Sequence, residues 1–362
     1  MVVKNIFDIC NPKQWRTISK STLKEEGYPV YGANGKIGFY SEYNHKEPTV
    51  LITCRGATCG EINISEPYSY ITGNAMCLDD LSDDVNLKYL FYYLKGRNMS
   101  DVISGTAQPQ ITKTNLRKLE VPLPSLDEQK AIVDKLDRAQ RLIDIDREML
   151  AKYDELIQSV FLDMFGDPVT NPKGWRKVEI KKLGEVVTGN TPSKKDSDNY
   201  GNHIEWIKTT NIQESRVYPT KATEFLSKKG SRTGRIIPKN SLIVSCIAGS
   251  LSSIGKSAVT DRKIAINQQI NAIIPEHDKV DVFFLYGQLI VAQELVQNAS
   301  TKSMKGMVSK SRFKKIELIK PDTKIQKTFC KYFHIIINEK KVLKEIINKE
   351  KRILKSLMYE VF

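Results

Sequence analysis

The sequence has few of the features that mark secreted, membrane-spanning or metal-binding proteins. Its 362 residues include six cysteines without CxxC spacing and four scattered histidines. This pattern fits neither a zinc site nor a disulfide scaffold, so we expect buried, reduced thiols and no bound metal. No apolar run approaches the roughly 18 residues that span a bilayer, and the N-terminal apolar stretch is too short for a signal peptide. We expect a soluble, cytoplasmic protein with no membrane partner.

Motifs of nucleotide-binding and DNA-modifying enzymes are also missing. The chain has no GxGxxG loop for a methyl donor and no Asn-Pro-Pro-Tyr or Asp-Pro-Pro-Tyr for adenine methylation. The segment "PDTK" at 321–324 lacks the separate Glu-x-Lys of a nuclease metal site. We therefore expect no catalytic residues.

One stretch, "GSLSSIGKS" at 249–257, resembles a phosphate-binding P-loop. Five residues separate Gly249 from Gly255, whereas a P-loop requires four. The residues that follow are rich in Ile, Val, Thr and Asn, which favours a strand over the helix that a P-loop opens. Nucleotide binding through Gly255, Lys256 and Ser257 stays an alternative that predicts ATP binding by the isolated chain.

Charge is unevenly distributed. The chain has 56 Lys and Arg against 42 Asp and Glu, a formal net charge of +14. Residues 1–126 hold 14 basic and 13 acidic side chains, whereas residues 164–323 hold 26 and 15. An excess of this size favours a polyanionic partner, and it lies mainly in the second half of the chain.

The sequence contains an internal repeat. Four segments recur in the same order: "NPKQW" as "NPKGW", "LITC" as "LIVSC", "YLFYYL" as "FLYGQL", and "ITKTNLRKLEV" as "VSKSRFKKIEL". The offset between copies grows from 160 to 197 residues, so the second copy carries insertions. Two diverged copies of one module are the simplest explanation. Strand-like stretches with short helices near 85–97 and 280–297 predict an α+β fold for each module.

A long helix is predicted after each module. The first begins at "PSLDEQ", where Ser125 and Glu128 form a capping box, and ends near Phe165 before Gly166. Its apolar residues follow steps of three and four, broken by Asp146, and the second helix repeats this pattern with Lys340 and Glu350 at polar positions. The residues predicted to pair the helices are Ile132, Leu136, Ile143, Leu150, Ile157, Phe333, Ile336, Leu343, Ile347 and Leu354.

The two helices are complementary in charge. Residues 127–163 hold ten acidic and six basic side chains, and residues 324–360 hold four and ten. Complementary charge and matching apolar seams predict that the helices pair as an antiparallel coiled coil, with one module at each end. The alternative is that each helix packs only on its own module. About 36 residues at 1.5 Å each would form a rod of roughly 54 Å, equivalent to about 16 base pairs of DNA.

These features resemble the specificity subunits of Type I restriction-modification systems. The most specific segment is "GTAQPQITKTNLRKLEVPLPSLDEQKAIVDKLDRAQ" at 105–140, and the repeat extends the resemblance over nearly the whole chain. The second copy keeps Pro321 and Gln326 but lacks the PLPxLxEQ run. The resemblance implies two target recognition domains at 1–124 and 167–321, and two spacer helices at 125–166 and 322–362.

The resemblance also implies a function. Each recognition domain would read one half of a split, asymmetric sequence in double-stranded DNA, and the helices would dock two methyltransferase subunits, with restriction subunits completing the complex. S-adenosylmethionine, ATP and Mg are expected on the partner subunits and none on this chain. Alternatives are a specificity subunit of a bipartite Type II-like enzyme, or a basic coiled-coil scaffold that binds protein or RNA.

Candidate DNA-binding residues are side chains that read base edges or hold phosphates. In the first module they are Lys36, Arg55, Thr58, Asn74, Gln108, Gln110 and Lys113. In the second they are Lys208, Thr210, Asn211, Ser253, Lys256, Gln268, Gln269, Lys302, Lys305 and Lys310.

Overall fold

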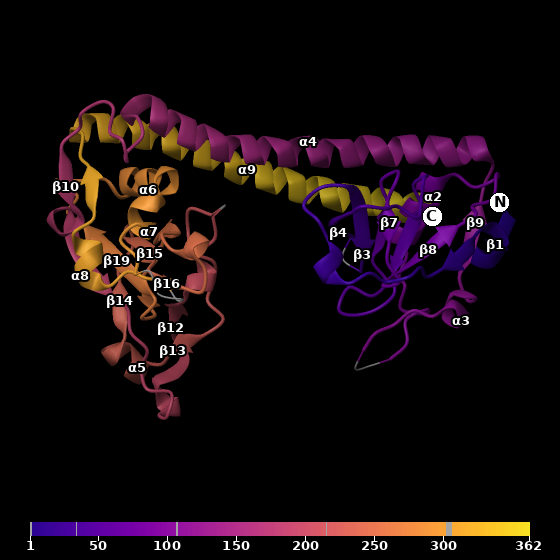
Figure 1. The fold of residues 1–362 in the computed structure, drawn as a ribbon, viewed down its shortest axis with the longest axis horizontal. Helices are drawn as coiled ribbons and strands as arrows, with labels where there is room; N and C mark the ends of the chain where they lie inside the picture. Colours follow the sequence, from indigo (N-terminus) through magenta and orange to yellow (C-terminus); the bar gives the residue numbers. More distant parts are fainter. Residues whose placement is uncertain (1, 34, 106–107, 215, 302–305) are drawn as a thin grey trace. The chain divides into compact units, whose positions relative to one another are not determined.

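The computed structural model describes residues 2–33, 35–105, 108–214, 216–301 and 306–362 (Figure 1). The chain forms two compact units, one of Met1–Arg147 with Glu345–Phe362 and the other of Glu148–Lys344. Each unit holds one α+β module and part of both long helices. Among the described helices, none combines the length and apolar character needed to cross a membrane.

The first unit is built on a four-stranded antiparallel sheet of order β2-β8-β5-β6. A second sheet, β4-β3-β7, pairs β3 with β7 in parallel, and β1 pairs with β9 to join the ends of the module. The central strands are apolar and buried on both faces. The elements are β1 (Val2–Asn5), α1 (Ile6–Ile9), β2 (Asn11–Lys13), β3 (Tyr28–Gly32), β4 (Gly35–Tyr40), β5 (Val50–Thr53), β6 (Ile62–Ile64), β7 (Tyr70–Ile71), β8 (Ala75–Asp79), α2 (Leu87–Gly96), α3 (Lys113–Leu116) and β9 (Glu120–Leu123).

The second unit repeats this topology. Its main sheet has the order β11-β19-β15-β17, its second sheet β13-β12-β18-β14, and β10 pairs with β21. The β12–β18 pair is parallel, as is β3–β7. The duplication of the module is thus confirmed, but the predicted match of NPKQW with NPKGW is wrong. Residues 11–13 form β2, whose counterpart is β11, whereas residues 171–175 precede β10, the counterpart of β1. The elements are β10 (Lys177–Glu179), β11 (Gly184–Thr188), β12 (Tyr200–Ile207), β13 (Phe225–Leu226), α5 (Lys228–Thr233), β14 (Arg235–Ile237), β15 (Leu242–Ser245), β16 (Ile247–Ala248), β17 (Ser257–Val259), β18 (Ile264–Ile266), β19 (Ile270–Pro275), α6 (Val282–Val291), α7 (Glu294–Gln297), β20 (Gly306–Met307), α8 (Lys310–Lys314) and β21 (Glu317–Ile319).

Insertions in the second copy explain why the offset between the copies grows from β3 to β5. Strands β12 and β13 are separated by residues 208–224, whereas two residues separate the equivalent strands β3 and β4. Helix α5 and strand β14 stand between β13 and β15, where the first copy has the nine residues 41–49 and no helix. The second unit therefore carries a larger outer sheet than the first.

The prediction that a strand follows the stretch resembling a P-loop is confirmed. Residues 251–253 form one 3-10 turn, Gly255 adopts a φ of +87°, and β17 follows directly. Lys256 of this turn leads into the strand β17, and its Nζ lies 2.9 Å from the Glu214 carboxylate. The geometry does not support the nucleotide-binding alternative.

The first long helix is α4 (Leu126–Phe165), and its predicted start and end are confirmed. The Glu128 carboxylate accepts hydrogen bonds from the Ser125 backbone N–H at 2.9 Å and from its hydroxyl at 2.8 Å. Gly166 follows with a φ of +73°, a conformation that glycine adopts without strain. The second long helix is α9 (Thr323–Val361).

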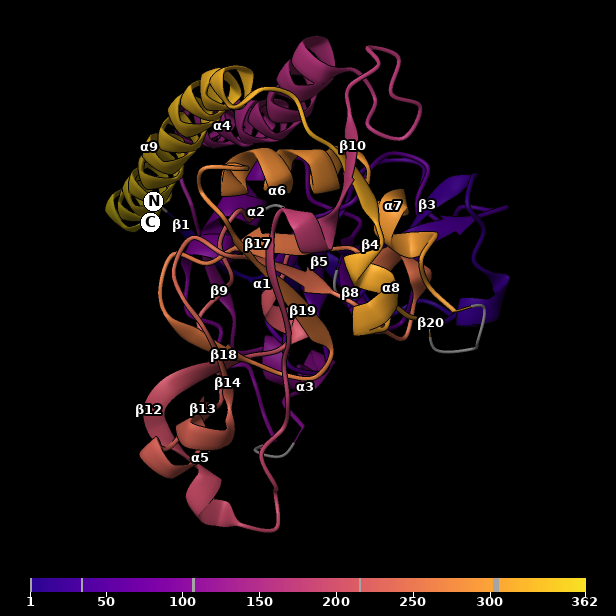
Figure 2. The same ribbon diagram turned by 90° about the vertical axis from the view of Figure 1, so that its left-hand side faces the viewer.

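Most residues of the predicted apolar seam are buried, Ile132 and Leu150 only partly, and each helix also packs on a module. In the second unit, Phe161 of α4 lies 5.3 Å from the Phe329 ring of α9 and 5.7 Å from the Phe284 ring of α6, between ring centroids. Figure 1 and Figure 2 show α6 between the long helices and the sheet of this unit. In the first unit, Met358 of α9 packs on Gly96 of α2. Each long helix therefore packs on the module that it does not directly follow, so the alternative in which each helix packs only on its own module is wrong.

Candidate nucleic-acid interface

Three loops of the first unit converge beyond the ends of its main sheet. The loop after β5 pairs with the loop before α3 through an isolated bridge between Arg55 and Gln110. The Ile111 N–H donates to the Cys54 carbonyl at 2.9 Å, and the Cys54 N–H donates to the Asn74 carbonyl at 3.1 Å. These backbone contacts bring the described residues of three stretches, 54–60, 72–74 and 104–105 with 108–111, into one cluster, which we call the three-loop cluster.

Most polar candidates of the first module lie on this cluster. Arg55, Asn74, Gln108 and Gln110 are exposed, and Thr58 is half-buried in the same loop as Arg55. Lys113 follows at the start of α3, also exposed. Guanidinium and amide groups that point to solvent from a rigid backbone frame are suited to hydrogen-bond base edges.

Lys36 is placed apart from the other candidates. It lies on β4, where its Nζ is 3.2 Å from a Glu66 carboxylate oxygen and 4.7 Å from the Phe39 ring centroid. Its charge is therefore opposed by a neighbouring acid. This pairing could not be predicted from local sequence, because Glu66 lies 30 residues further along the chain.

The second unit builds the same cluster from equivalent positions. The Val308 N–H donates to the Cys246 carbonyl at 2.8 Å, matching Ile111 and Cys54, and the Cys246 N–H donates to the Gln269 carbonyl at 2.8 Å. Strands β16 and β20 extend this pairing. The three-loop cluster thus occurs once in each module, and the second copy presents Ser253, Gln268, Gln269 and the exposed Lys310 around it.

Several candidates of the second module have partners within the protein. The Lys208 ammonium pairs with the Glu224 carboxylate, and Lys256 with Glu214. The Asn211 side chain accepts from the Lys208 N–H at 3.0 Å and donates to Thr220 Oγ1 at 3.0 Å, so it organises the 208–224 loop. Thr210 is exposed beside it. Lys302 and Lys305 lie outside the described residues.

The cysteine thiols at the two clusters are unreactive. Burial raises the pKa of the Cys54 thiol and of the Cys246 thiol to about 12, so both stay protonated near neutral pH. They fill space under the loops and do not supply nucleophiles.

One group of potential metal ligands, missed by sequence reasoning, lies elsewhere in the first unit. His45, Cys77 and Asp79 offer ligand atoms within 4.8 Å of one another. Both ring nitrogens of His45 already contact oxygen atoms, Asn44 Oδ1 at 2.7 Å and Asp79 Oδ1 at 3.0 Å. The other Asp79 oxygen accepts from Trp15 Nε1 at 2.9 Å, and burial raises the pKa of the Cys77 thiol. His45, Asp79 and Trp15 form a hydrogen-bond network that holds the end of β8 to the loop 41–49 and to the segment after β2.

The duplicated modules match one known family. Residues 1–152 and 172–350 each match the Type I restriction modification DNA specificity domain. The chain belongs to this family. These two matches coincide with the two copies of the repeat and cover most of the sequence.

Curated proteins that are similar to this chain carry names from the same family. The chain is 33% identical over 198 residues to the Type I restriction enzyme HindI specificity subunit of Haemophilus influenzae, covering 52% of this chain and 40% of that protein. It is 32% identical over 142 residues to the EcoprrI specificity subunit of Escherichia coli, covering 37% of this chain and 35% of that protein. The matches thus span about two fifths or less of these relatives' lengths.

Solved structures share the fold. A chain from a structure of the type I R-M system has a TM-score of 0.59 and 16% identity, covering 99% of this chain and 97% of that chain. The S subunit from M. genitalium has a TM-score of 0.52 and 17% identity, covering 100% and 96%.

Proposed function

We propose that this chain is the DNA-specificity subunit of a Type I restriction-modification complex and has no catalytic role of its own. Each module reads one half of a bipartite, asymmetric target in double-stranded DNA. The observation that carries the proposal is the three-loop cluster, which the chain builds twice with the same backbone hydrogen bonds and with different exposed polar side chains. Two copies of one frame with different side chains suit the reading of two different half-sites.

The long helices are proposed to form an antiparallel coiled coil that sets the spacing between half-sites. In the second unit, the Asp154 carboxylate of α4 pairs with the Lys340 ammonium of α9. In the first unit, Lys135 Nζ lies 3.8 Å from a Glu360 oxygen. Within the second unit, moving along α4 from Asp154 to Phe161 corresponds to moving back along α9 from Lys340 to Phe329, which supports opposite directions.

The outer faces of the helices are proposed to dock two methyltransferase subunits, and restriction subunits join them. Large apolar side chains stand exposed outside the buried seam. In the first unit they are Leu142, Ile145, Ile346 and Ile353, and in the second Met149, Leu156, Tyr332, Ile335 and Val342. Apolar stripes of this kind on helices that have already buried one seam favour a protein partner. S-adenosylmethionine, ATP and Mg belong to those partners in this proposal.

The proposal is tested by mapping DNA methylation in cells that express the methyltransferase encoded beside this chain, with and without the chain. We expect a split adenine-methylated motif with a fixed gap that disappears without the chain. Methylation that is independent of the chain contradicts the proposal and favours a scaffold that binds protein or RNA. A partner that carries fused nuclease and methyltransferase activities would identify the Type II-like alternative.

A further inference from the structure

The second unit carries an outer segment that is more basic than its counterpart in the first. Residues 189–241, from the end of β11 to the start of β15, contain ten Lys and Arg against five acidic side chains. The equivalent residues 14–49 contain five and four. The insertions that distinguish the two copies therefore account for part of the charge excess of the second half. We call residues 190–206 and 224–237 the basic arm.

The basic arm is held together by specific contacts between its two segments. The Asn190 side chain donates to the Thr233 carbonyl at 2.8 Å and accepts from the Arg235 N–H at 2.9 Å. A Cβ on Gly230 would lie 1.9 Å from the Asn199 carbonyl oxygen, so only glycine permits this approach. Basic residues from both segments are thus fixed on one structural element.

Every acidic side chain of the basic arm already has a cationic partner. Lys229 Nζ lies 2.8 Å from an Asp196 oxygen and 3.5 Å from an Asp198 oxygen. Glu205 binds Arg262, with 2.7 Å between Oε2 and Nη2, and Glu224 pairs with Lys208. Three cations, Lys229, Arg262 and Lys208, thus face the four carboxylates of the arm and offset all but one of their charges.

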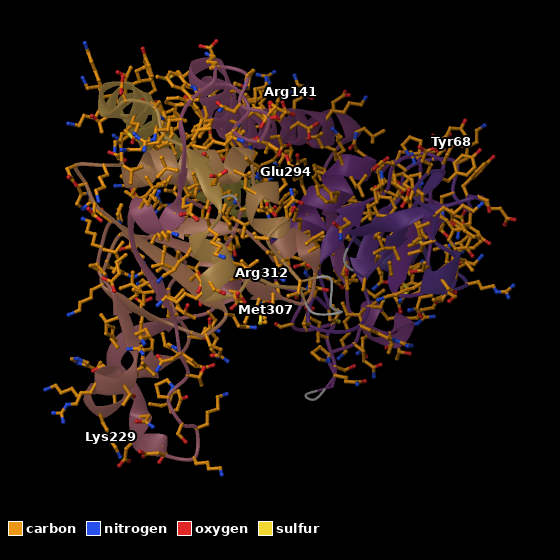
Figure 3. The ribbon with its side chains drawn as sticks, turned by 60° about the vertical axis from the view of Figure 1, so that its left-hand side comes forward. Tyr68, Arg141, Lys229, Glu294, Met307 and Arg312 are labelled. Carbon is orange, nitrogen blue, oxygen red and sulfur yellow. The ribbon has the colours of Figure 1, made fainter. Side chains whose placement is uncertain are left out.

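The remaining cations of the basic arm have no acidic partner within the described part of the chain. They are all exposed: Lys194, Lys195, Lys228, Arg232 and Arg235. Figure 1 and Figure 2 show α5, β12 and β13 at the end of this unit farthest from α4 and α9, and Figure 3 shows Lys229 projecting there. Five unopposed charges on a small projecting element create a strong local positive potential.

We propose that the basic arm binds the sugar–phosphate backbone of double-stranded DNA beside the half-site read by the second module. This inference rests on the proposed function. Phosphate contacts supply affinity without sequence information and release counterions, and Lys and Arg are the residues that make them. The first module has 14 basic and 13 acidic side chains in residues 1–126, and its described residues 41–49 contain no helix or strand where the second module has α5 and β14. We therefore expect the second module to supply more of the electrostatic affinity than the first, in addition to the contacts that Arg55 and Lys113 make from the first module.

The test is the salt dependence of DNA binding by the full chain, co-purified with its methyltransferase subunits. The variant Lys228→Gln/Arg232→Gln/Arg235→Gln removes three charges from the basic arm. A matched control, Lys182→Gln/Lys324→Gln/Lys327→Gln, removes three charges from exposed positions elsewhere in the same unit. Association constants are measured for a duplex containing the mapped motif and for a random duplex of equal length, over a range of KCl concentrations.

We plot the logarithm of the association constant against the logarithm of the salt concentration. For the arm variant we expect the magnitude of the slope to fall by about 2 to 3, because each lost phosphate contact removes about 0.9 from it. The ratio of motif to random binding should stay the same, and the control should retain the wild-type slope. An arm variant with the wild-type slope, or an equal change in the control, overturns the proposal. RNA that outcompetes duplex DNA for the arm also overturns it. Failure of the unmodified complex to bind any duplex would instead reject the proposed function.

Discussion

Arg262 connects two segments of the second unit that are far apart in sequence. Its guanidinium makes two hydrogen bonds to the Glu205 carboxylate, 2.8 Å from Nε and 2.7 Å from Nη2. It also donates to the Thr220 carbonyl at 3.1 Å, in the 208–224 loop. Because the Glu205 side chain is only 18% exposed, removal of Arg262 leaves a carboxylate with little water around it. Arg262 therefore sets the position of both the loop and β12.

We predict that Arg262→Met lowers the free energy of unfolding by about 1–3 kcal/mol at neutral pH. The Arg262 hydrogen bonds hold the pKa of Glu205 below its ordinary value of 4.5. The unfolded chain thus binds this proton more readily, so the stabilisation is present above pH 4.5 and is lost as pH falls through the folded-state pKa. Urea unfolding at several pH values should show the difference between variant and wild type narrowing in acid. A constant difference would contradict this account.

Gly287 is required where α6 meets both long helices in the second unit. A Cβ at this position would lie 2.7 Å from the Phe329 ring and 3.0 Å from the Phe161 ring. We predict that Gly287→Val lowers the free energy of unfolding by about 1–3 kcal/mol through overpacking. Gly249→Val is the matched control, because its Cβ would have no neighbour within 4 Å. Equal midpoint temperatures of thermal unfolding for the two variants would show that Phe161 and Phe329 leave room for a side chain at position 287.

At the scale of elements, the long helices were the most predictable part of the fold. Their capping box, apolar seam and stop signal are local in sequence, so the residues themselves encode α4. Phe161 and Met358 were missed as buried residues because they pack on the modules, outside the heptad pattern. The strand order and the three-loop cluster depend on contacts between distant segments, such as Cys54 with Ile111, which periodicity does not encode. The repeat indicated that the modules are equivalent, but it did not indicate which acids pair with Lys36, Lys208 and Lys256.

The Asp154–Lys340 pair provides a test of helix pairing. The Lys340 side chain is 7% exposed, and that of Asp154 is 40% exposed. We predict that Asp154→Leu alone lowers the free energy of unfolding by about 1–3 kcal/mol, because it leaves a buried ammonium without a partner. The double variant Asp154→Leu/Lys340→Leu should recover most of this loss in the same urea titration. Additive losses in the double variant would indicate that the two side chains do not interact.

At the scale of the whole molecule, the proposed spacer makes a prediction about the DNA target. Helix α4 passes from the first unit to the second between Arg147 and Glu148, and α9 returns between Lys344 and Glu345. Inserting seven residues at both points keeps the heptad register and lengthens each helix by about 10 Å, or about three base pairs. We expect methylation at the original gap to be lost and the same half-sites to be methylated at the larger gap. Continued methylation at the original gap would rule out the helices as spacers, and an insertion in α4 alone is the control that breaks the register.

The first and last strands of each module pair with each other, β1 with β9 and β10 with β21. The chain thus enters and leaves each module at neighbouring points. A gene segment that encodes one module can therefore be exchanged by recombination without changing the path of the rest of the chain. Such an exchange would combine one existing module with one new module in a single event. The pairing of two short strands at the base of each module makes new DNA targets accessible to evolution without the need to build a new protein.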